Sequence, residues 1–130
     1  MVQVVSSNLK KHRIRAVLTG GACASVHSGG AYLSHDLDYI VQGAAYVHSA
    51  STFFVEFPAG PLGIGDDDLV EPVEIQVGRA RVLALSATDS CRDRLAAFYH
   101  WNDRQSLRVA AAIAAARRVN NRATMRGARL

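Results

Sequence analysis

Two aspartates, Asp36 and Asp38, stand at alternate positions of the apolar stretch HDLDYIV, residues 35–41. Side chains at alternate positions of a β-strand point to one face of the sheet, so the two carboxylates are expected close together. Two like charges repel at short range unless they share a cation. Mg²⁺, or Mn²⁺ in its place, binds a few carboxylate oxygens together with water and substrate phosphates. The pair therefore predicts a metal site; the alternative is two acidic residues on the solvent face of a strand.

Glu56 is the candidate for a third carboxylate. It lies in TFFVEF, residues 52–57, the most aromatic strand candidate of the chain, on the face opposite Phe53, Val55 and Phe57. An unpaired charge is costly in such a strand, which favours a partner for Glu56. We expect Glu56 to complete the metal site. The other interpretation is an exposed face of an edge strand.

A glycine pair, Gly20 and Gly21, ends the apolar strand candidate IRAVLTG, residues 14–20. The small residues of GACASVHS, 21–28, suit a short helix directly after it. Glycine allows backbone N–H groups to approach a phosphate closely, and a helix start favours an anion. A cation held nearby would neutralise phosphate charge and orient it for in-line attack. The simpler interpretation is that the two glycines only end a strand.

These motifs together resemble the signature of the DNA polymerase β-type nucleotidyltransferase superfamily. The resemblance rests on Leu18-Thr19-Gly20-Gly21, a short helix, and Ser34-His35-Asp36-Leu37-Asp38. The chain is most similar to the small bacterial branch that includes abortive-infection toxins, and residues 53–67 and 84–107 also resemble that branch. The resemblance implies a mixed sheet flanked by helices, a magnesium ion, an NTP as donor, and transfer of a nucleotidyl group. The sequence leaves the acceptor open between an RNA end, a protein hydroxyl and a small molecule.

The resemblance also implies roles for individual residues. Asp36, Asp38 and Glu56 would be the catalytic, metal-binding carboxylates. Further members of the implied site are those that would contact the nucleotide: Gly20, Gly21, Ser34 and Arg94. Asp103 matches a position that is often acidic in the branch. For Arg94 the alternative is an ordinary residue on a helix surface.

The chain departs from this family after Asp38. Relatives usually carry a helix and its loops before the third-carboxylate strand, whereas this chain has only residues 42–51 there. A missing layer leaves apolar surface uncovered, so we expect a homodimer in which two chains cover one another. The departure also leaves a second function open. The chain would then be a catalytically degenerate nucleotidyltransferase-like domain that acts as a homodimeric nucleotide- or protein-binding module.

The periodicity of the sequence predicts the elements that must position these residues. The expected fold is a single α+β domain over residues 1–118, with a mixed sheet and a C-terminal pair of helices. Capping residues Ser86 and Asn102 precede the two C-terminal helices, and Gly78-Arg79 marks a hairpin. The expected helices are 1–12, 21–28, 87–99 and 103–118, and the expected strands are 14–19, 36–41, 52–57, 73–77 and 81–85.

Charge and cysteine content bound the remaining possibilities. The net charge of +4 comes from five C-terminal arginines, without which ten basic residues face eleven acidic ones. We therefore expect a basic, disordered tail over residues 119–130 rather than a basic domain. Cys23 and Cys91 do not form a Cys-x-x-Cys pair, which favours a reducing compartment. With no stretch of membrane-spanning length and no signal-peptide pattern, the expected location is the cytoplasm.

Overall fold

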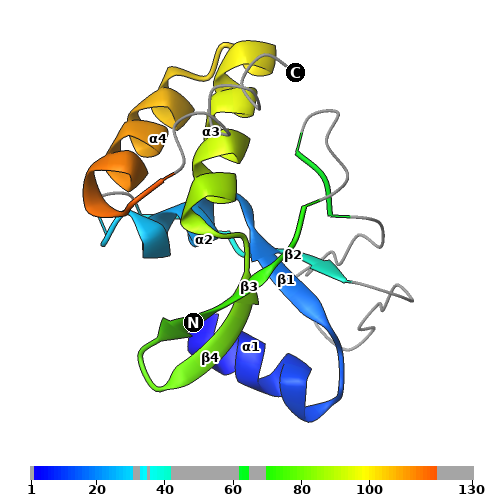
Figure 1. Ribbon diagram of the computed structural model, residues 1–130. Helices are drawn as coiled ribbons and strands as arrows, with labels where there is room; N and C mark the ends of the chain where they lie inside the picture. The colour runs from blue at the N-terminus through cyan, green and yellow to red at the C-terminus, as the bar shows by residue number, and fades with distance from the viewer. Residues whose placement is uncertain (1, 31–32, 35, 42–61, 65–69, 120–130) are drawn as a thin grey trace.

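The computed structural model describes residues 2–30, 33–34, 36–41, 62–64 and 70–119. Helices and strands together form an α+β fold, which confirms the predicted class (Figure 1). In chain order the elements are α1 (Val2–Lys11), β1 (Ala16–Thr19), α2 (Gly20–His27), β2 (Asp38–Val41), β3 (Val73–Val77), β4 (Ala80–Ala84), α3 (Ala87–Trp101) and α4 (Arg104–Ala116).

The strands form a mixed four-stranded sheet in the order β2-β1-β4-β3. β1 pairs antiparallel with β2, and β3 pairs antiparallel with β4. The two halves meet where β1 runs parallel to β4, with Leu18 opposite Ala84. The β3–β4 hairpin turns at the predicted Gly78-Arg79, where Gly78 adopts a φ of +59° that favours glycine.

Helices cover both faces of the sheet. α1 lies on one face, where the hydroxyl groups of Ser6 and Tyr39 are hydrogen-bonded at 2.7 Å. α3 and α4 lie on the other side, and α2 packs against the sheet and against both of these helices (Figure 1). Because α2 consists of small residues, it is buried on most of its circumference; its buried residues are Gly21, Ala22, Cys23, Ala24 and His27.

The apolar interior has two parts, one on each side of α2. The larger part gathers the sheet with α1 and contains the fully buried Leu18, Tyr39 and Leu85. The smaller part joins Ala24 of α2 to Cys91 of α3 and Ile113 of α4. The helix that follows the glycine pair is thus held by packing from both directions, which gives the start of α2 a defined position.

Two sequence predictions about element ends need correction. The strand predicted over 36–41 begins at Asp38, because the backbone of Asp36 bends and is held by Ser34. Asn102, predicted to cap the last helix, instead ends α3 with a left-handed φ of +53°. The side chain of Asp103 caps α4, accepting hydrogen bonds from the backbone N–H groups of Gln105 and Ser106.

The remaining elements are close to the predictions, within one or two residues at most ends. The predicted strand 52–57 and nearly all of the predicted tail, residues 120–130, lie outside the described residues. In the part of the chain that is described, no helix has the length and apolar character needed to cross a lipid bilayer.

Candidate functional site

The glycine motif and the Asp-Leu-Asp motif meet at one corner of the sheet. Thr19, the last residue of β1, lies opposite Asp38, the first residue of β2. The Thr19 hydroxyl donates a hydrogen bond of 3.2 Å to the Asp38 backbone carbonyl. Thr19 also immediately precedes α2, yet its side chain makes no capping hydrogen bond to that helix. The first turn of α2 therefore has backbone N–H groups without the usual hydroxyl acceptor.

Gly20 lets the Asp38 carboxylate lie directly against the start of α2. A Cβ atom placed on Gly20 would stand 2.5 Å from Asp38 Oδ2 and 3.1 Å from its Cγ. Gly20 also has a φ of +62°, a conformation that residues with a side chain rarely adopt. Both constraints require glycine here, so the corner depends on Gly20 for its backbone shape and for the position of Asp38.

Asp36 lies two residues before Asp38, in the bend that leads into β2. The Ser34 hydroxyl donates to the Asp36 carbonyl at 2.9 Å and accepts from the Asp36 N–H at 3.3 Å. Ser34, predicted to contact the nucleotide, is thus bonded to the backbone that carries Asp36. The Asp36 and Asp38 side chains are both exposed, so a ligand from solvent can reach them.

This corner offers oxygen ligands for a hard cation beside N–H donors for an anion. The positive end of the α2 dipole lies at Gly20, next to the Asp38 carboxylate. Mg²⁺ is commonly held by one or two carboxylates together with substrate phosphates, and the residues present fit that requirement. No cluster of three metal-ligating side chains occurs among the described residues. Glu56, the predicted third ligand, lies outside them.

Arg94 is half-buried on α3 and forms an ion pair with its neighbour Asp93. The guanidinium donates to Asp93 Oδ2 from Nη2 at 2.7 Å and from Nε at 3.2 Å. Both charges act on the Cys23 thiol of α2, and Arg94 also helps to lower the pKa of Asp103. Arg94 is therefore partly buried and already paired on α3, rather than on a fully solvated surface.

The sequence analysis named Thr19 only within the glycine motif, and it did not name Asp93, the partner of Arg94 on α3. The signal for Asp93 was the charged run Arg92-Asp93-Arg94 on a helix that also presents buried residues. The signal for Thr19 was its place directly before the glycine pair, where a hydroxyl is a common cap. The pairing of Thr19 with Asp38 requires the strand register, which spacing alone does not reveal.

Cys23 and His27 line the interior side of α2 and have structural roles. Burial raises the pKa of the Cys23 thiol to about 12, so the thiol is protonated at neutral pH. The Leu85 carbonyl accepts hydrogen bonds from Cys23 Sγ at 3.6 Å and from His27 Nε2 at 2.8 Å. Cys91 is buried as well, and both cysteines are free thiols. The chemistry of this corner therefore belongs to carboxylates and backbone amides, not to a thiolate.

Among the comparisons with known proteins, the comparison of structures finds a similar fold. The fold is similar to the crystal structure of an antigenic nucleotidyltransferase-like protein from Paracoccidioides brasiliensis, with a TM-score of 0.63. The two chains are 14% identical, and the match covers 86% of this chain and 72% of the other. Neither a protein-family model nor a curated protein matches the sequence. The structural likeness shows a nucleotidyltransferase-like fold.

Proposed function

We propose that this chain is a magnesium-dependent nucleotidyltransferase that moves a nucleotidyl group from an NTP to an RNA or protein acceptor. The observation that carries the proposal is the contact of Asp38 with Gly20 at the start of α2. It places a carboxylate of the proposed metal site at the uncapped N-terminus of a helix, and it occurs within a nucleotidyltransferase-like fold.

Each part of the corner has a defined task in this reaction. Asp36 and Asp38 hold the cation, with Glu56 as the third ligand in this proposal. The N–H groups at Gly20 and Gly21 bind phosphate oxygens of the triphosphate. Bound Mg²⁺ supplies positive charge that stabilises the phosphates as negative charge develops on them. Arg94, held by Asp93, adds a second positive charge near α2.

The reaction balances without any further reagent. An acceptor hydroxyl attacks the α-phosphorus and forms a new P–O bond. The bond from the α-phosphorus to the bridging oxygen breaks, and pyrophosphate leaves with that electron pair. The hydroxyl proton passes to water or to a carboxylate at the corner. Asp36 and Asp38 are exposed, so both carboxylates are accessible to a ligand from solvent.

The test is transfer of label from an α-labelled NTP in the presence of Mg²⁺. Asp36→Asn and Asp38→Asn should each lower the rate by about a thousandfold, because each removes a metal ligand and a negative charge. Glu71→Gln is the matched control, since Glu71 is an exposed carboxylate outside the corner. Full transfer by the Asp38 variant would contradict the proposal.

The same variants separate catalysis from binding. Mg²⁺ with an NTP should raise the Tm of the parent protein but not of Asp38→Asn. In the absence of metal, Asp36→Asn should melt at the same temperature as the parent or higher, because one of two like charges is gone; in Asp38→Asn the lost interaction with the start of α2 offsets this gain. If Mg²⁺ and an NTP raise the Tm but no label is transferred, the chain is instead the catalytically degenerate, homodimeric binding module.

A further inference from the structure

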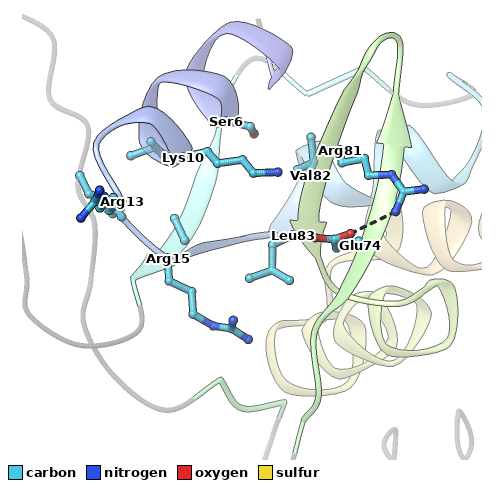
Figure 2. A pocket seen from close by; sticks show the side chains of 11 residues that line it. Ser6, Lys10, Arg13, Arg15, Glu74, Arg81, Val82 and Leu83 are labelled. Carbon is cyan, nitrogen blue, oxygen red and sulfur yellow. Dashed lines mark hydrogen bonds and ion pairs between the residues drawn. The ribbon is translucent and has the colours of Figure 1, made fainter.

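A cavity lies at the other end of β1 from the corner of Gly20 and Asp38. It has a volume of about 290 Å³ and opens between α1, the turn into β1, and the β3–β4 hairpin (Figure 2). Tyr39 points to the α1 face, where it meets Ser6, so its neighbour Asp38 points to the other face. Ser6 also lines the cavity. The cavity is thus separate from the proposed active site.

The cavity combines an apolar floor with a positively charged rim. The floor consists of aliphatic side chains, namely Leu9, Ile14, Ala16, Val82 and Leu83. The rim consists of exposed cationic residues, namely Lys10, Arg13, Arg15 and Arg81. Three of these rim residues belong to the run Lys10-Lys11-His12-Arg13-Ile14-Arg15, the densest basic stretch of the described chain.

Glu74 is the carboxylate among the described residues that line this cavity. Its Oε2 lies 3.3 Å from Nη1 of Arg81, and both side chains are largely exposed. An exposed ion pair of this kind is weak, so Arg81 can exchange Glu74 for another anion at low cost. Figure 2 shows Lys10 extending from α1 across the gap toward Val82 of β4, with Arg81 beyond Val82 and its guanidinium directed toward Glu74; both cations are among the residues that line the cavity. Two cations from different elements therefore border one opening.

We propose that this cavity binds the phosphate backbone of a single-stranded nucleic acid. Clustered Lys and Arg side chains bind phosphates without regard to sequence, and a linear basic run suits a repeating anion. The aliphatic floor can pack against the flat face of one base, as apolar side chains do in other strand-binding pockets. The cationic rim would recognise the phosphate groups, and in this proposal these belong to a single-stranded nucleic acid.

The test uses a fluorescein-labelled single-stranded RNA of twelve nucleotides, with the full chain, in 0.15 M salt. EDTA is present and NTP is absent, so the measurement does not depend on the proposed transfer reaction. Lys10→Gln and Arg81→Gln should each weaken binding about tenfold, as expected for loss of a charged hydrogen bond. Each should also reduce the slope of log K against log salt by about 0.7.

Two control variants distinguish binding at the cavity from a general effect of the protein's net charge on RNA affinity. Lys11→Gln makes the same change one residue from Lys10 but outside the cavity lining, and it should weaken binding clearly less than Lys10→Gln because its side chain does not border the opening. Glu74→Gln removes the negative charge beside Arg81, so it should tighten binding. Equal weakening by Lys10→Gln and Lys11→Gln would overturn the cavity as the site, as would weaker binding by Glu74→Gln.

Tripolyphosphate distinguishes a strand from a small anion. If the strand is the ligand, tripolyphosphate competes only at concentrations far above those of the RNA, because it lacks bases for the floor. Binding of tripolyphosphate together with no binding of RNA would overturn the proposal. Circular dichroism of each variant verifies that Lys10→Gln and Arg81→Gln retain their helices, since both positions are exposed and neither change alters the core.

Discussion

Three elements meet at Gly20, namely the end of β1, the start of α2 and Asp38 of β2. They can approach this closely because Gly20 has no side chain. Gly20→Ala should destabilise the protein by about 2–4 kcal/mol, through the positive φ and through the clash with the Asp38 carboxylate. Urea unfolding measures the loss. Gly29→Ala is the matched control, because Gly29 has a similar φ of +67° and open space around its Cβ position.

The control isolates the contact with Asp38. Gly29→Ala should cost only the conformational part, about 1 kcal/mol. If the two alanine variants lose equal stability, the Asp38 carboxylate does not constrain Gly20. Retention of full nucleotidyl transfer by Gly20→Ala would be a separate contradiction, because the added methyl group must displace the proposed metal ligand.

His27 should make stability depend on pH. Burial is the main cause that lowers its pKa below 6.5, with a further decrease from Arg117 and an opposing increase from the bond to the Leu85 carbonyl. Nε2 carries the proton in that bond, because a carbonyl only accepts. Between the lowered pKa and 6.5 the unfolded chain binds more protons at this residue, so this contribution to stability is complete above pH 6.5 and falls as the pH decreases.

Urea unfolding between pH 7.5 and pH 5 measures this effect. One proton taken up on unfolding changes the free energy by at most about 1.4 kcal/mol per pH unit. The slope of the parent should exceed that of His27→Gln, which keeps an N–H donor but does not titrate. Identical slopes would show that His27 titrates normally in the folded protein.

At the scale of elements, the junction between α3 and α4 divides two roles between adjacent residues. Asn102 ends α3 in the left-handed conformation, and Asp103 begins α4 through hydrogen bonds to Gln105, Ser106 and the Ser106 hydroxyl. Asp103→Ala should lower the Tm by a few degrees, because these acceptors are lost. Asn102→Gly should keep or raise the Tm, since glycine adopts this φ readily. Thermal melts followed by circular dichroism compare the Tm of the two variants. A larger decrease in Tm for Asn102→Gly than for Asp103→Ala would show that Asn102, not Asp103, caps α4.

The local elements could be predicted because their signals are local. The hairpin around Gly78-Arg79 is marked by a glycine between two alternating strands, and the start of α3 by the Ser86 hydroxyl that accepts from Asp89 N–H. The exchange of roles between Asn102 and Asp103 was not predictable, because both residue types cap helices well. Only the backbone conformation at each position decides between them.

The site could be predicted in its parts but not in its contacts. The spacing of the glycine pair and the Asp-Leu-Asp motif indicated that Gly20 and Asp38 serve one purpose, and the structure brings them together. The pairing of Thr19 with Asp38 and the parallel alignment of β1 with β4 depend on residues distant in the sequence. Hydrophobic periodicity carries no information on such pairings. The roles of the site residues stay predictions.

At the scale of the whole molecule, we expect a homodimer. Large apolar side chains are exposed near the end of α3 and the start of α4, with Trp101 82% exposed and Leu107 40% exposed. The dimer should bury roughly 1,200 Å² or more, with the Ala-rich α4 or residues 52–57 at the contact. Light scattering at micromolar concentrations measures the mass. Trp101→Ser should weaken the dimer, whereas Val4→Ser, on the distant α1, should not. The mass of a monomer throughout would contradict this expectation.

The parallel contact between β1 and β4 has a consequence for how the chain folds. Each outer strand pairs within its own half of the sheet, whereas Leu18 and Ala84 meet across about half the length of the chain. The Leu85 N–H bonds to the Leu18 carbonyl at 3.1 Å, and the Leu85 carbonyl binds His27, so one residue fastens the two halves. Closing such a long loop costs entropy before the contacts form. We therefore expect the docking of the two half-sheets along this line to limit the rate of folding, whereas the corner of Gly20 and Asp38 lies within the N-terminal half and can form before it.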